Sequence, residues 1–316
     1  MHPSRARKSA SRHSLASLLL GACLALAAAC ARPTGVASPA AARAARGPLL
    51  VVGGGPQPDA LVRRFVELAG GPGRARIVVL AQASGSGQRS GEEKAVQLRG
   101  MGADARSLWF DRAGADADTI AALLRDATGV WFGGGDQNRL AGVLLGSRAL
   151  DAIRSAWQRG AVVGGTSAGA AVLSTPMITG DERRRGGARP PSDSSGDAFM
   201  TIERDNVVTA DGFGFLTDVI VDQHFIRRRR HNRLMSLVLE REPHLGAGID
   251  ESTALLVQPD GTWVVEGASV VVVYDARRAA ISRRGDHAVA ATDLRVHVLT
   301  PGSKFDPRSG KVELAK

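Results

Sequence analysis

A serine flanked by glycines at a strand-to-helix transition constrains the fold more than any other feature. The apolar run 161–164 leads into residues 165–169, which read Gly-Thr-Ser-Ala-Gly, and a helical run of small residues follows at 170–173. Glycine allows a sharp turn where a Cβ would clash. The pattern is typical of a nucleophile elbow, in which a strand ends at an exposed serine and a helix begins. It predicts that the hydroxyl of Ser167 lies at the carboxyl end of a strand.

Short apolar strands alternate with helical segments around this turn. We predict strands at 49–52, 75–80, 105–109 and 129–132, and helices at 59–68, 92–99, 119–125, 140–145 and 150–158. Such alternation predicts a doubly wound α/β fold: a mostly parallel sheet flanked by helices, with ligands at the carboxyl ends of its strands.

The last third of the chain changes character. Residues 254–257 and 262–265 flank an Asp-Gly turn and predict a hairpin, and 270–274 predicts a further strand. We interpret these strands as an antiparallel C-terminal extension of the same sheet. Residues 48–316 are therefore expected to form a single domain.

The N-terminus has the pattern of an export signal. A basic stretch at 5–13 precedes an apolar run at 15–29, so residues 1–30 are predicted to be a signal peptide and 31–47 a flexible tether. Cys23 follows Leu-Gly-Ala and Cys30 follows Ala-Ala-Ala, which resemble lipidation sites. The sequence leaves open a membrane-anchored lipoprotein and a soluble exported protein cleaved near Ala29.

One internal segment contains almost no apolar side chains that a core could bury. Residues 181–197 are rich in arginine, glycine, proline and serine, which predicts a mobile loop. A lid over the active site and a solvated insertion are both compatible with this composition.

Charge and motifs exclude several classes of function. The formal charge is +10, but the basic residues are not interleaved with aromatic side chains that stack on bases, so we expect no nucleic-acid partner. The loop 53–58 has proline where the dinucleotide-binding fingerprint needs its last glycine. The chain contains no HExxH, CxxC or EF-hand spacing, so we expect no metal and no cofactor.

A serine nucleophile needs a base and an orienting acid. Of the histidines beyond the signal, His224 follows an apolar strand and is the best candidate; the others are His231, expected to be solvated, His244 in a loop, and His287 and His297 in C-terminal strands. Asp250 and Glu251 follow another strand, and spacing does not choose between them. The order Ser, His, acid differs from the α/β-hydrolase order.

Four segments together resemble a known family. Residues 133–137, 165–170, 222–225 and 248–251 look like the motifs of the cyanophycinase-like serine peptidases, a family that also includes aspartyl dipeptidase (peptidase E), and the resemblance extends from about residue 49 to 274. It implies a class I glutamine-amidotransferase-like arrangement and a homodimer. It also implies Ser167 as nucleophile, His224 as base and Glu251 as acid.

The resemblance also implies a substrate site. Gln137, Asp222 and Gln223 would be pocket residues, and Arg228, Arg230 and Arg233 would clamp carboxylates. Our oxyanion candidates are Gly135, Asp136 and the N–H of Ala168.

Cyanophycin, the family's substrate, is poly-aspartate with arginine on each side-chain carboxyl. The resemblance therefore implies an exported exopeptidase that releases β-Asp-Arg dipeptides from a polymer rich in aspartate and arginine. A dipeptidase for aspartyl or isoaspartyl peptides and a non-catalytic peptide-binding surface lipoprotein are the alternatives.

Overall fold

The computed structural model describes residues 46–183, 199–283 and 285–316. The predicted signal peptide, nearly all of the tether and residues 184–197 of the predicted loop lie outside the described residues. Everything described belongs to one compact unit, Pro39–Lys316.

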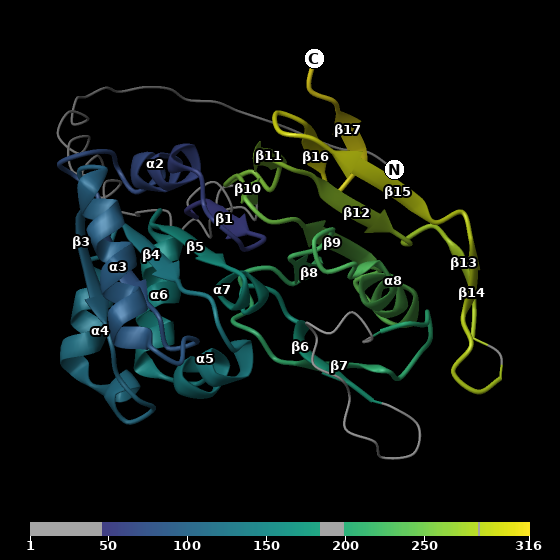
Figure 1. Ribbon diagram of the computed structural model, residues 1–316, viewed down its shortest axis with the longest axis horizontal. Coiled ribbons are helices and arrows are strands. Elements are labelled where there is room, and N and C mark those ends of the chain that lie inside the picture. The colour runs from purple at the N-terminus through teal and green to yellow at the C-terminus, as the bar shows by residue number, and fades with distance from the viewer. Residues whose placement is uncertain (1–45, 184–198, 284) are drawn as a thin grey trace, which may run out of the picture. The chain divides into compact units, whose positions relative to one another are not determined.

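Within the described residues, nine strands form the principal sheet (Figure 1). Its parallel part contains five strands in the order β1 (Leu49–Val52), β5 (Val162–Thr166), β4 (Gly129–Phe132), β2 (Arg76–Leu80) and β3 (Asp104–Leu108). The antiparallel part continues from β1 through β10 (Thr253–Val257), β11 (Trp263–Gly267), β16 (Lys304–Asp306) and β17 (Lys311–Glu313). The predicted fold class, with its antiparallel C-terminal extension, is confirmed.

Helices cover both faces of the parallel strands, as a doubly wound sheet requires. Helices α2 (Asp59–Leu68) and α3 (Gly87–Gly100) bury apolar side chains against one face. The opposite face packs against α4 (Asp118–Arg125), α5 (Gln137–Leu144), α6 (Arg148–Gln158) and the short α7 (Ala168–Ala171). A 3₁₀ turn, η1 (Gly114–Asp116), precedes α4.

A separate sheet of four described strands holds the rest of the predicted extension. Its order is β15 (Arg295–Leu299), β12 (Val271–Asp275), β9 (Leu245–Ile249) and β8 (Ile220–Gln223). The expectation that residues 270–274 extend the principal sheet is therefore wrong, because β12 pairs with β9 and β15. One face of this sheet packs on α8 (His231–Glu240), and its other face contributes to the main core.

The remaining strands form two ribbons. They pair β6 (Met177–Glu182) with β7 (Val207–Ala210), and β13 (Ala280–Ser282) with β14 (Ala290–Thr292). No helix in the part of the chain that the structure describes has the length and apolar character needed to cross a bilayer.

Candidate active site

The serine turn has the geometry that its glycines predict. Ser167 stands between β5 and α7 with a φ of 54°, a left-handed conformation that costs energy for a residue with a Cβ. A Cβ at Gly165 would lie 2.3 Å from the carbonyl oxygen of Gly169, and one at Gly169 would lie 2.2 Å from that of Phe132. Only glycine therefore fits on either side of the elbow, and the serine is held at the end of its strand.

His224 comes from the second sheet. It follows β8 directly and also has a positive φ, 51°. Its backbone N–H donates to the carbonyl oxygen of Gly53, 2.6 Å away, at the end of β1. This bond joins the two sheets at the point where the imidazole meets the elbow.

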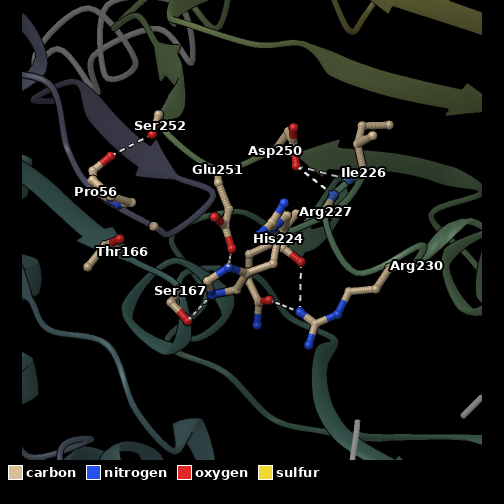
Figure 2. A network of polar contacts seen from close by, with 12 residues as sticks. Pro56, Thr166, Ser167, His224, Ile226, Arg227, Arg230, Asp250, Glu251 and Ser252 are labelled. Carbon is tan, nitrogen blue, oxygen red and sulfur yellow. Dashed lines mark hydrogen bonds and ion pairs between the residues drawn. The ribbon is translucent and has the colours of Figure 1, made fainter. Parts of the chain in front are cut away.

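Ser167, His224 and Glu251 form a hydrogen-bonded series (Figure 2). The Nε2 atom of His224 lies 2.8 Å from the Ser167 hydroxyl oxygen, and Nδ1 lies 2.6 Å from Oε1 of Glu251. The histidine is 7% exposed. Because a carboxylate only accepts, Nδ1 carries the proton and Nε2 is left to accept the proton of the serine. This is the arrangement that nucleophilic catalysis by serine requires.

The structure also separates the two adjacent carboxylates. Asp250 turns away from the imidazole: its Oδ1 accepts from the backbone N–H groups of Ile226 and Arg227, at 3.1 and 3.0 Å, and its Oδ2 accepts from the Ser269 hydroxyl. Asp250 thus fixes the turn that follows His224, whereas Glu251 contacts the ring.

Residues 53–55, which we call the glycine loop, lie against the His224–Glu251 pair. A Cβ at Gly54 would lie 2.3 Å from Cε1 of the imidazole, and one at Gly55 would lie 2.8 Å from Oε2 of Glu251. Ser252, directly after Glu251, donates its backbone N–H to the Gly54 carbonyl oxygen at 2.9 Å. The loop is thus a tight turn beside the predicted catalytic groups.

The predicted oxyanion donors need one correction. The N–H of Asp136 is already bonded to the carbonyl oxygen of Ala83, 2.9 Å away, and the Asp136 carboxylate caps α5. Ala168 opens α7, so its N–H has no partner within that helix. Gly134 packs on the elbow, since a Cβ there would lie 3.4 Å from that of Ser167. Gly135 and Ala168 therefore remain as predicted oxyanion donors, and the structure adds the neighbouring Gly134 as a candidate.

Two of the three predicted arginine clamps are internal. Arg233 is 1% exposed and grips the Asp222 carboxylate through Nε and one terminal nitrogen, at 2.8 and 2.5 Å. Arg230 is 4% exposed and donates to the backbone and side-chain oxygens of Gln223. The expectation that Arg230 and Arg233 clamp substrate is corrected, because both guanidinium groups bond to the buried end of β8. Asp222 and Gln223 are likewise internal partners.

Arg228 and Gln137 have different surroundings. Arg228 is exposed in the turn after His224, so it is the predicted clamp that remains at the surface. Gln137 is buried, and its amide donates to the carbonyl oxygens of Ile178 and Thr179 at 3.0 and 2.5 Å. Gln137 therefore joins α5 to β6, and its role as a pocket residue stays a prediction.

The other histidines do not contact the elbow. His231 is half-buried, not solvated, and its Nδ1 lies 2.8 Å from the Tyr274 hydroxyl. The Nδ1 of His244 bonds to the carbonyl oxygen of Val238. His297 lies in β15 as expected, but His287 lies in a loop. Among the histidines of the described residues, His224 is the one that bonds Ser167.

In the same part of the chain, no group of three or more His, Cys, Asp or Glu side chains is placed to hold a metal ion.

The environment of His224 predicts a pH dependence. Burial lowers the pKa of His224 below the ordinary histidine value of 6.5, the hydrogen bond to Glu251 opposes this shift, and the charges of Arg228 and Arg230 lower the pKa further. Since the predicted base can act only as the neutral imidazole, we expect kcat/KM to rise with pH through a pKa below 6.5. Arg228→Gln removes one positive charge and should move this acid limb to higher pH.

A pH–rate profile of the wild type and of Arg228→Gln checks this prediction. An acid limb above pH 6.5, or one that Arg228→Gln moves to lower pH, would contradict it.

The lowered pKa of His224 also affects the free energy of unfolding. The folded state binds a proton on His224 more weakly than the unfolded chain does. The contribution of His224 to the free energy of unfolding is therefore present above pH 6.5 and is lost as the pH falls below it.

The doubly wound sheet and the Ser–His–Glu series together define an α/β protein of the serine-hydrolase type. The chain belongs to peptidase family S51, whose model matches residues 49–265. It is 35% identical over 208 residues to a cyanophycinase of Synechococcus elongatus, covering 64% of this chain and 60% of that protein.

Two further proteins are similar to this chain, one in sequence and one in fold. The chain is 32% identical over 283 residues to a cyanophycinase of Geminocystis herdmanii, covering 85% of this chain and 98% of that protein. A crystal structure of a peptidase from an acI-B1 Actinobacterium superposes with a TM-score of 0.59 at 22% identity, over 83% of this chain and 97% of that one. The likeness to that structure concerns the fold alone.

Proposed function

We propose that this protein is a serine exopeptidase that hydrolyses cyanophycin to β-Asp-Arg dipeptides. The observation that carries the proposal is the hydrogen-bonded series Ser167–His224–Glu251 on a strained elbow. Membership of family S51 and the similarity to curated cyanophycinases support the substrate class.

The proposed mechanism follows from the geometry. Ser167 attacks the scissile carbonyl while Nε2 of His224 takes its proton, and Glu251 holds the resulting imidazolium. The N–H of Ala168 and the backbone at 134–135 face the developing oxyanion. The imidazolium then returns its proton to the leaving amine, and water hydrolyses the acyl-enzyme by the same steps.

A second substrate class, short aspartyl or isoaspartyl peptides, is favoured by one observation. The exposed arginines of the turn after His224 are Arg227, Arg228 and Arg229, whereas Arg230 and Arg233 are occupied internally. A surface with fewer clamps for carboxylates suits a short peptide better than a polymer that carries many carboxylates.

A comparison of kcat/KM between substrates tests this proposal. The full chain is incubated with cyanophycin and with β-Asp-Arg, Asp-X and isoaspartyl dipeptides, and kcat/KM is measured for each by chromatography of the products. The proposal expects the polymer to be preferred and β-Asp-Arg to accumulate. Preferred cleavage of dipeptides would replace it with the second candidate. Peptide binding without turnover would point to a non-catalytic binding protein.

We also propose that the protein is exported, in a lipid-anchored or soluble form, and that it is a homodimer. The basic and apolar pattern of residues 1–30 supports export, and the family resemblance supports the dimer. The mass of the mature N-terminal peptide and sedimentation of the purified protein are the corresponding measurements.

A further inference from the structure

We propose that Lys94 and Gln57 form a positioning pair that ties the nucleophile elbow to the glycine loop. The inference rests on the proposed function, because the pair would act on the spacing of the same catalytic groups. Lys94 belongs to no motif of the sequence, Gln57 lies in the loop 53–58 but was assigned no role, and neither contacts Ser167 or His224 directly.

Gln57 spans the two elements through one amide group. Its Nε2 donates to the Thr166 hydroxyl oxygen at 3.2 Å and to the Gly55 carbonyl oxygen at 3.3 Å. Thr166 directly precedes Ser167 in the chain, and Gly55 lies against the Glu251 carboxylate. The amide therefore joins the side chain of the residue before the nucleophile to the backbone beside the orienting acid.

Lys94 determines which way this amide faces. Its Nζ lies 2.5 Å from Oε1 of Gln57. An ammonium only donates hydrogen bonds, so it fixes the carbonyl end of the amide on its own side and leaves Nε2 for Thr166 and Gly55. A charged donor also makes this bond stronger than a neutral one would be.

Lys94 has two further contacts. Its Nζ lies 2.7 Å from Oε1 of Gln97 on the same helix, a bond that does not reach the elbow or the glycine loop, and 4.8 Å from the centroid of the Trp131 ring of β4. Burial lowers the pKa of Lys94 to about 8. Burial thus disfavours the charged ammonium, and this cost offsets the hydrogen bonds that a substitution of Lys94 removes.

The glycine loop transmits this constraint to the predicted base. Gly54 lies beneath the imidazole of His224, and Gly55 lies beside the carboxylate of Glu251. If the amide of Gln57 is released, the loop can move relative to the elbow. Small displacements of this kind lower kcat strongly, because the reacting groups must be aligned to within a fraction of an ångström.

The test compares kcat, KM and Tm in matched variants of the full chain. Lys94→Met removes the donor and should lower kcat about tenfold, leave KM unchanged and not lower Tm. Lys94→Arg restores a charged donor and should recover activity. Gln97→Leu removes the lysine's other partner, and Lys311→Met removes an exposed lysine, so both should behave as wild type.

A second measurement does not depend on turnover. The Nδ1 proton of His224 in its bond to Glu251 should give a downfield ¹H NMR resonance, which Lys94→Met should shift or broaden and Gln97→Leu should not. Wild-type protein without turnover would refute the proposed function, while this resonance would still decide the positioning role.

Gln57→Glu provides a second route should Lys94→Met fail to fold. The substitution keeps an acceptor for Lys94 but removes the Nε2 donor to Thr166 and Gly55, so it should also lower kcat. Unchanged kcat and an unchanged resonance in the folded Lys94 and Gln57 variants, or an equal loss in Gln97→Leu, would overturn the proposal.

Discussion

Ser167→Ala is expected to abolish hydrolysis of the peptide substrate without changing the fold. The Ser167 hydroxyl, which donates to Nε2 of His224 at 2.8 Å, is the proposed nucleophile, and alanine keeps the Cβ but has no oxygen. In serine peptidases, loss of the nucleophile lowers kcat by about 10⁴-fold or more. The measurement is kcat on the best substrate, together with circular dichroism and Tm.

Ser282→Ala is the matched control, because Ser282 is exposed in β13 and belongs to no part of the proposed site. It should retain wild-type kcat. Turnover by Ser167→Ala at the wild-type rate would rule out the serine mechanism.

Gly54→Ala is expected to have the second largest effect. Its new Cβ would stand 2.3 Å from Cε1 of His224, at a backbone φ of 112° that alanine adopts poorly. The imidazole must move away from Ser167, and kcat should fall by at least about 100-fold. The free energy of unfolding should fall by about 2 to 4 kcal/mol from overpacking and backbone strain.

Gly71→Ala separates the clash from the strain. Gly71 also has a positive φ, 84°, but no atom of the described chain lies within 4 Å of the Cβ position. It should lose about 1 kcal/mol of stability from conformation alone and keep its activity. Denaturant unfolding and kcat of both variants check the comparison. Equal kcat in Gly54→Ala and wild type would contradict the position assigned to the imidazole.

Much of the parallel core could be predicted from local pattern. Residues 59–68 and 129–132 form α2 and β4 with the predicted bounds, because apolar periodicity and flanking glycines coincide there. The sheet to which β12 belongs could not be predicted in this way. All five residues of β12 are buried, and an apolar run of this kind does not indicate which strand lies beside it.

Only part of the site could be predicted from the sequence, for a similar reason. Ser167 and His224 could be predicted because each follows a strand, whereas Asp250 and Glu251 are adjacent and both acidic. What separates them is the chain's passage from β9 in one sheet to β10 in the other, which turns one carboxylate toward Ile226 and the other toward the imidazole. Spacing along the chain does not encode that direction.

The arginines and the supporting residues depend on tertiary packing. Arg230 and Arg233 fall within a basic run that reads as exposed, yet both turn inward to the end of β8. Nothing in the sequence relates Lys94 to the loop 53–58 that contains Gln57, because the two residues meet only through the packing of α3.

Mapping of a fluorophosphonate adduct tests the central claim most directly. Trypsin releases residues 160–183 as one peptide, which contains Ser167 and the fully buried Ser174. Tandem mass spectrometry of labelled wild-type protein should place the adduct on Ser167, and His224→Ala should label far more slowly. An adduct on another serine, or no adduct on folded protein that turns over substrate, would contradict the assignment of Ser167 as the nucleophile.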